Sequence, residues 1–151
     1  MENPVTEPRF DLNSVLPAAY NSLLEVEKFV QSAGIKKIQL ELLKIRASQI
    51  NGCAFCLNMH VKDALKYGED AKRIFVLSAW REAPNWFDEE EKAILTLTEE
   101  ITLISKSGLS DKTYKKAIEL FGEVKTAQLI MAVVAINSWN RIAVSLNSHP
   151  Q

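Results

Sequence analysis

The apolar positions of this chain recur with the three- and four-residue spacing of helices. Ile94, Leu97, Ile101 and Ile104 follow one another at such intervals, which places them on one side of a helix. No stretch of useful length alternates between apolar and polar residues as a strand does, and each of the five glycines follows a periodic segment, where helices commonly end. The pattern predicts an all-α protein, a bundle of about seven helices, over residues 17–33, 36–51, 53–67, 70–81, 89–106, 111–121 and 124–147.

Residues typical of helix starts stand at several of these boundaries. Pro17 suits a first helical turn, because its missing N–H would have no partner there. Asp88 and Glu91 have the spacing of a capping box, and Ser110 can cap the helix that follows it. Residues 1–12 show no such signals, and we predict an N-terminal arm that packs on the body or on a neighbouring subunit, followed by one helical domain over 13–151.

Length and composition indicate an ordinary globular domain. The chain has 151 residues, 47% of them hydrophobic and 25% charged, which is enough to bury a core without metal or disulfide support. Lys and Arg number 18 against 19 for Asp and Glu. Because this balance gives no basic field to hold a phosphate backbone, we do not expect nucleic acid as a partner.

Neither export nor membrane insertion is expected. The first eight residues are polar and lack the apolar centre of a signal peptide. The longest apolar stretch, residues 129–136, is far shorter than the roughly 20 residues of a membrane span. The sequence therefore predicts a cytoplasmic protein.

The only two cysteines form a Cys53-Ala-Phe-Cys56 motif, and His60 follows four residues later. At about 100° per residue the two thiols and the imidazole fall within an arc of about 60° on one helix face. The cysteines also occupy the expected first turn, where unpaired N–H groups and the helix dipole favour a thiolate. This arrangement is suited to thiol redox chemistry.

A cysteine pair can also serve a disulfide framework, a zinc site or simple packing. A secreted disulfide framework uses more cysteines in a shorter chain. A structural zinc site needs four ligands, and only His149 or a carboxylate could complete a set made of the two cysteines and His60. The cysteines could also be buried without chemistry. Because a vicinal pair in a cytoplasmic protein is more often redox-active than structural, we expect a redox pair with no metal or cofactor.

Glu41 is the expected partner of His60. A turn around Gly52 would fold the two flanking helices into a hairpin, with Glu41 roughly 15 to 17 Å and His60 roughly 10 to 12 Å from the turn. Glu41 borders an apolar stripe that contains Leu42 and Ile45, so its carboxylate should be partly buried and should need a partner. His60, oriented by Glu41, could then act as general base for a thiol.

These residues match a known motif. Glu41, Cys53, Cys56 and His60 form the pattern E-x11-C-x2-C-x3-H, which resembles the signature of the AhpD-like alkylhydroperoxidases within the carboxymuconolactone decarboxylase superfamily. Residues 43–66, 79–84 and 136–141 also resemble the small single-domain members, so the resemblance covers most of the chain from about residue 12.

The resemblance implies an all-helical homo-oligomer, a trimer or hexamer, that serves antioxidant defence by reducing hydroperoxides. It implies that Cys56 is the peroxidatic thiol, that Cys53 is the resolving thiol, and that Glu41 and His60 form a proton relay. The implied reductant is a dithiol, on a lipoyl domain or a thioredoxin-like protein. The founding enzyme has a second histidine directly before the second cysteine, where this chain has Phe55.

Two further functions stay open from sequence. The decarboxylases of the superfamily resemble the same fold but lack the CxxC, and this chain shows no set of histidines and arginines suited to a lactone. A non-enzymatic redox sensor would use the same disulfide with negligible turnover. The segment 127–136 with Trp139 is apolar over more than one helix face, which supports burial between subunits.

Overall fold

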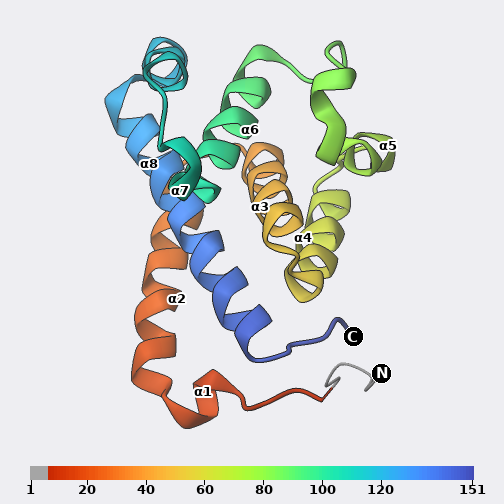
Figure 1. Cartoon of the computed structure of the whole chain (residues 1–151), viewed down its shortest axis with the longest axis vertical. Helices are drawn as coiled ribbons and strands as arrows, with labels where there is room; N and C mark the ends of the chain where they lie inside the picture. The colour runs from red at the N-terminus through yellow and green to blue at the C-terminus, as the bar shows by residue number, and fades with distance from the viewer. Residues whose placement is uncertain (1–6) are drawn as a thin grey trace.

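The structure, a computed structural model, describes residues 7–151, and within them it contains helices and no strand (Figure 1). The all-α prediction is therefore confirmed. In chain order the elements are α1 (Leu12–Val15), α2 (Pro17–Ser32), α3 (Lys37–Asn51), α4 (Ala54–Lys66), α5 (Ala71–Phe75), the 3-10 helix η1 (Leu77–Glu82), α6 (Glu89–Thr102), α7 (Ile104–Ser107) and α8 (Asp111–Ser145).

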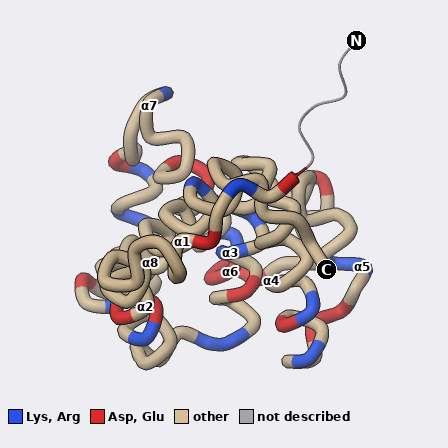
Figure 2. Tube along the Cα trace, turned by 90° about the horizontal axis from the view of Figure 1, so that it is seen from below, with Lys and Arg blue, Asp and Glu red and all other residues tan. Residues whose placement is uncertain are grey.

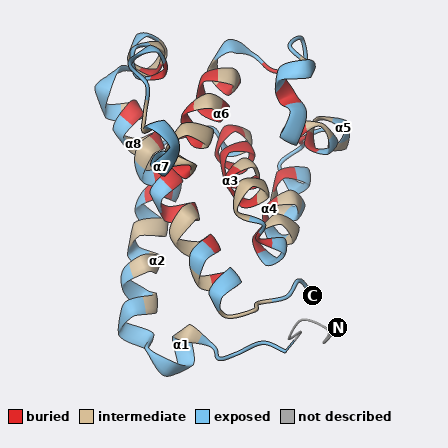
Figure 3. Ribbon diagram, viewed as in Figure 1, coloured by how far each residue is buried: buried red, intermediate tan, exposed pale blue. Residues whose placement is uncertain are grey.

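The α3 helix lies at the centre of the bundle. It packs against α4, α6 and α8, and α2 lies along α8 (Figure 1). Nine of its 15 residues are buried, whereas α2 buries only Val30 and is exposed along most of its length (Figure 3). The residues of α3 therefore face neighbouring helices on several sides, and any charged group among them must find its partner inside the protein.

Two groups of buried apolar side chains meet at α3. Leu40, Leu43 and Ala47 pack with residues of α6 and α8, while Leu42 and Ile45 pack with residues of α4, η1 and α6. The helix thus contributes a separate apolar face to each group. This double packing fixes the rotation of α3 about its axis and the direction of its polar residues.

Two helices predicted as continuous are divided in the structure. The predicted helix 70–81 is α5 followed by η1, and Ala79 within η1 has non-helical angles of φ −125° and ψ 31°. Ile74, Leu77 and Trp80 are buried at a spacing of three, which either an α-helix or a 3-10 helix can place on one face over so short a segment. The predicted helix 89–106 is α6 and α7, separated at Leu103.

The predicted boundary near residue 122 is present as a bend. The helices expected at 111–121 and 124–147 form the single element α8, in which Gly122 has φ 74° and ψ 175°. Glycine adopts this backbone without the Cβ clash that other residues would meet. With α1, which was not predicted, these differences give nine helices among the described residues in place of about seven.

The predicted N-terminal arm lies partly outside the described residues. Within its described part, Arg9 donates its backbone N–H to Leu146 O at 2.9 Å and its side chain to Ser145 O at 2.9 Å. Asp11 then caps α1 by accepting from the N–H of Ser14. These contacts attach the segment before α1 to the end of α8.

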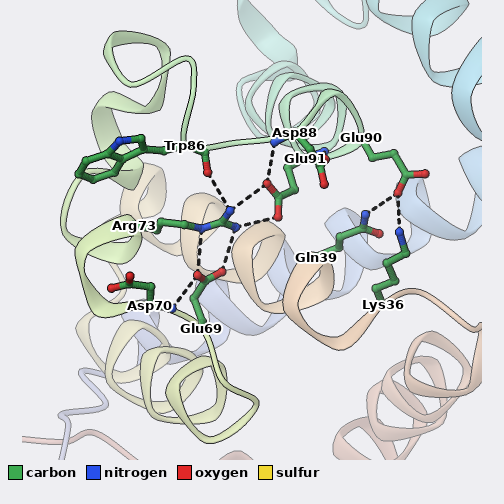
Figure 4. A network of polar contacts seen from close by, with 9 residues as sticks. All are labelled: Lys36, Gln39, Glu69, Asp70, Arg73, Trp86, Asp88, Glu90 and Glu91. Carbon is green, nitrogen blue, oxygen red and sulfur yellow. Dashed lines mark hydrogen bonds and ion pairs between the residues drawn. The ribbon is translucent and has the colours of Figure 1, made fainter.

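An ionic network attaches the α4–α5 connection to α6 (Figure 4). Arg73 donates to Glu91 at 2.7 Å, to Glu69 at 3.1 Å and to the Trp86 carbonyl at 2.8 Å. Glu91 also completes the predicted capping box with Asp88, which is confirmed. One guanidinium therefore joins three segments that close this end of the bundle.

Charged residues of both signs are distributed over the chain (Figure 2). Positions of both signs occur on several helices and do not form one large region of a single sign. No helix among residues 7–151 has the length and apolarity needed to cross a membrane.

The central position of α3 predicts a large stability loss from a cavity there. Leu43 is fully buried, and Leu43→Ala should lower the free energy of unfolding by about 2 to 5 kcal/mol. Urea unfolding followed by circular dichroism would measure it. The matched change Leu65→Ala, at a residue that is 45% exposed on α4, should cost less than about 1 kcal/mol. Equal losses at the two positions would contradict the central role of α3.

Candidate functional site

The cysteine motif stands at a tight hairpin between α3 and α4. Gly52 caps α3 in the left-handed conformation, with φ 66° and ψ 36°, which a residue with a Cβ adopts only with strain. Cys53 directly follows as the N-cap of α4, and its N–H bonds to Ser48 O at 3.0 Å. The hairpin predicted from the sequence is confirmed.

Cys53 and Cys56 form a disulfide with their Cα atoms 5.3 Å apart. Both residues are buried, at 1% and 2% exposure, beside Ala143 of α8. Cys53 Sγ accepts from the Cys56 N–H at 3.3 Å, so the sulfur occupies the position of a capping group at the start of α4. The first turn of the helix therefore presents its N–H groups to the redox centre.

Glu41 and His60 form the contact that the hairpin geometry predicts. His60 Nδ1 and Glu41 Oε2 lie 2.9 Å apart, and the two residues are 7% and 3% exposed. An ionised carboxylate can only accept, so opposite such a group the ring donates from Nδ1, and a neutral imidazole then has its lone pair on Nε2. The structure thus brings together a buried imidazole and a buried carboxylate in hydrogen-bond contact.

A polar chain connects this hairpin to α8. Asn140 is fully buried; it donates to Ser48 Oγ at 3.0 Å and accepts from Asn51 at 2.9 Å. Asn51 also donates to Asn137 Oδ1 at 3.0 Å. The sequence signal for this connection was the pair of asparagines within an apolar helix, but their partners could not be derived from spacing alone. These hydrogen bonds fix the end of α3 that precedes the cysteines.

A cavity of about 500 Å³ opens beside the disulfide. Cys56, His60 and Glu41 line it, whereas Cys53 is absent from its lining. Its apolar wall comes from the segment around α1 and from α2, α4 and α8, through Phe10, Leu12, Leu24, Phe55, Met59, Trp139, Ile142, Ala143 and Leu146. A space of this size with apolar walls and a few polar groups is typical of a small-molecule site.

Another hollow, of about 560 Å³, lies at the start of α3, between Lys36, Lys37 and Tyr67. Neither cysteine nor His60 lines it. The chemical groups that the sequence singled out converge on the cavity beside the disulfide, so we place the candidate site there.

An ion pair between a buried lysine and a partly buried glutamate lies on the wall of the same cavity. Lys44 Nζ and Glu27 Oε1 are 2.5 Å apart, and the Lys44 side chain is only 2% exposed. Burial raises the pKa of the Glu27 carboxyl, but the charge and hydrogen bond of Lys44 outweigh this and hold the pKa below its ordinary value. This pair was not predicted from the sequence. Its only signal was a lysine between apolar residues of α3, three positions after Glu41.

A group of possible metal donors occurs at the site. Atoms of Glu41, His60 and Asp63 lie within 4.8 Å of one another. Glu41 and His60 already bond to each other, and the two cysteines of the zinc set considered from sequence form a disulfide. We assign no metal to this group.

Comparison with known proteins identifies the family. Residues 16–100 match the carboxymuconolactone decarboxylase family. The chain belongs to this family. The match includes Glu41, both cysteines and His60, so the family resemblance expected from the sequence is confirmed.

Individual relatives agree with this assignment. The uncharacterized protein YdfG of Bacillus subtilis is 39% identical over 93% of this chain and 95% of its own. The crystal structure of ATU0492 from Agrobacterium tumefaciens, a protein of unknown function whose suggested role is that of the antioxidant defence protein AhpD, has a TM-score of 0.91 and 36% identity over 96% of this chain and 99% of its own. The helical bundle is therefore AhpD-like.

A more distant relative shares the fold alone. An uncharacterized peroxidase-related protein from Silicibacter sp. TM1040 has a TM-score of 0.76 with 18% identity, over 100% of this chain and 91% of its own. The bundle is thus retained where most of the sequence has changed.

The position of the disulfide predicts that it opens without unfolding the domain. The bond closes a loop of only a few residues, so its loss adds little chain entropy to the unfolded state. Mild reduction should release two thiols per chain while the helical circular dichroism stays unchanged. Thiol titration and far-ultraviolet spectra would measure both effects.

Re-oxidation should close the bond again and remove both thiols. Cys53→Ser, which retains one thiol, is the matched control and should form no disulfide within the chain, which mass spectrometry would show. Loss of helicity on reduction, or one bound zinc per chain that blocks re-oxidation, would contradict a reversible redox pair.

Proposed function

We propose that this protein is a thiol-dependent peroxidase of the alkylhydroperoxidase type, acting through a dithiol and disulfide cycle. One observation carries the proposal: Cys56 lines the same cavity as the buried Glu41–His60 pair. A redox-active sulfur, a base and space for a small molecule therefore meet at one place.

The first step consumes the peroxide. In the reduced protein, His60 Nε2 accepts the proton of the Cys56 thiol, directly or through a water. The thiolate sulfur bonds to the terminal oxygen of the hydroperoxide, the O–O bond breaks, and Cys56 becomes a sulfenic acid. The proton held by His60 then passes to the departing alkoxide, which leaves as an alcohol.

The second step closes the disulfide. The sulfur of Cys53 bonds to the sulfur of Cys56, the S–O bond breaks, and the departing hydroxide takes the Cys53 proton to leave as water. A reductant with two thiols then returns two electrons and two protons to the pair. The Cys53–Cys56 bond of the structure corresponds to the product of this step.

The positions of the two cysteines support this division of roles. Cys56 lines the cavity and stands one helical turn before His60, whereas Cys53 lies outside the lining at the hairpin. The suggested antioxidant role of the Agrobacterium tumefaciens relative agrees with the chemistry. Phe55, also on the cavity wall, occupies the position of the second histidine of the founding enzyme, so the relay here would rest on His60 and Glu41.

The proposed cycle also has requirements outside the site. A reducing compartment, the cytoplasm, would keep the dithiol available, and a lipoyl domain or a thioredoxin-like protein would serve as the dithiol reductant. No cofactor enters either step of the cycle.

Substitutions should separate the four residues by role. Cys56→Ser should abolish peroxide consumption, whereas Cys53→Ser should form a sulfenic acid that does not recycle. Glu41→Gln and His60→Ala should slow the first step by about 10- to 10⁴-fold, because each weakens general-base catalysis. Stopped-flow consumption of cumene hydroperoxide, with a sulfenate probe and mass spectrometry, would measure these effects.

The surface carboxylate change Glu119→Gln is the matched control for Glu41→Gln and should leave the rate unchanged. A sulfenate found on Cys53 instead of Cys56, or full activity in His60→Ala, would show that the roles are assigned wrongly. Disulfide formation without turnover on any dithiol would indicate a sensor, and carbon dioxide release from a muconolactone would indicate a decarboxylase.

We further propose that the protein is a homo-oligomer, a trimer or hexamer. Met131, Val134 and Val144 are 37%, 43% and 48% exposed on α8, although neighbouring residues of this helix belong to the core. Light scattering at micromolar concentration should give a small multiple of the 17.0 kDa chain mass, because burial of these side chains between subunits would be favourable. A mass of one chain would contradict the proposal.

A further inference from the structure

Lys44 is a charged residue that the proposed peroxidase cycle does not use. It lies on the central helix α3 and is only 2% exposed. Removing an ammonium group from water costs several kcal/mol unless an opposite charge compensates for it. Glu27 of α2 supplies that charge, with Oε1 2.5 Å from Lys44 Nζ. Packing alone does not account for a lysine in such a place.

Stability alone does not account for the pair either. Glu27 Oε1 accepts hydrogen bonds from Lys44 and from Gln31, the latter at 3.0 Å. The other oxygen, Oε2, is buried with no hydrogen-bond partner among the described residues. Buried ion pairs with incomplete hydrogen bonding contribute no more to stability than apolar residues of similar size. The pair is therefore better understood from what its charge does nearby.

The other charges around the cavity indicate what the positive charge of Lys44 does there. Four carboxylates line it, those of Asp11, Glu27, Glu41 and Asp63. Lys44 is the one Lys or Arg among its described lining residues. It also follows Glu41 by three residues on α3, which places the two on the same helix face.

We propose that Lys44, held by Glu27, is a positioning residue of the thiol site, whose ammonium supplies positive charge to the cavity and favours the thiolate of Cys56. The inference rests on the proposed function and adds a source of positive charge to it. An opposite charge nearby favours the ionised form of a carboxyl or thiol, and the effect is larger away from water. Tyr20 and Tyr67 are the remaining titratable groups of the lining.

The two partners of the ion pair make opposite predictions. Lys44→Met removes the positive charge and leaves Glu27, so the pKa of the Cys56 thiol should rise. Glu27→Gln leaves Lys44 without its counter-charge, so the same pKa should fall. A merely structural ion pair would instead give the same direction of change in both variants, because either substitution breaks the same contact.

The experiment measures this pKa directly. In a Cys53→Ser background the chain has Cys56 as its single thiol, and the rate of its alkylation by iodoacetamide is followed from pH 4 to 10 with mass spectrometry. At a pH below the pKa of the parent protein, Lys44→Met should slow alkylation about tenfold, and Glu27→Gln should accelerate it. Lys44→Arg should restore the rate of the parent protein, because it retains the charge.

Glu25→Gln is the matched control. Glu25 lies on the same helix as Glu27 and pairs with Lys28 at the surface, so its loss should leave the Cys56 pKa unchanged. In folded Lys44→Met or folded Glu27→Gln, a Cys56 pKa that is unchanged or that moves against the stated direction would overturn the proposal. If Lys44→Met fails to fold, the Cys56 pKa measured in Glu27→Gln tests the proposal by itself.

This readout does not depend on peroxide turnover. If the pKa values move as stated but no variant consumes hydroperoxide, the proposed function fails while the role of Lys44 stands. If the parent protein consumes hydroperoxide but the pKa values do not move, the peroxidase proposal stands and the role of Lys44 is wrong.

Discussion

The site depends on the burial of charged residues along α3. This helix is covered on several sides by α4, α6 and α8, yet it carries Glu41 and Lys44 at 3% and 2% exposure. Each is almost wholly removed from bulk water, so each requires a counter-group from another helix. His60 from α4 and Glu27 from α2 supply them. Three helices are thereby held in the arrangement that forms the cavity.

Apolar packing determines where these charges point. Leu43 and Leu42 belong to different core groups on different sides of α3, so the helix cannot rotate without exposing one of them. At the end of α3, the bonds from Asn140 to Ser48 and from Asn51 to Asn140 hold the hairpin against α8. The position of the cysteines therefore follows from packing and from polar contacts that lie outside the thiol chemistry.

Local features of the fold and site could be predicted from the sequence. The hairpin at Gly52 and the contact of Glu41 with His60 follow from helix geometry over 20 residues, because one short turn fixes how the two helices face each other. The division of 70–81 into α5 and η1 could not be predicted, since three buried residues spaced by three fit either helix type over so short a segment. A four-residue helix such as α1 has too few apolar positions to show a period.

Contacts between distant segments could not be predicted from the sequence, for a different reason. Lys44 and Glu27 are 17 residues apart on separate helices, and periodicity gives the face of each helix but not the angle at which two helices cross. The cavity wall could not be predicted for the same reason, because it combines Phe10, Leu24, Phe55 and Trp139 from four parts of the chain.

This combination of an apolar wall with paired charges also determines the chemistry of the cavity. Apolar side chains such as Phe10 and Trp139 lower the local dielectric constant, so a charge at Glu41 or Lys44 acts more strongly on its neighbours than it would in water. The same surroundings raise the cost of an unpaired charge. Positive charge nearby favours an ionised thiol in such a place, and the fold places a buried ammonium one helical turn from Glu41, the carboxylate that contacts His60.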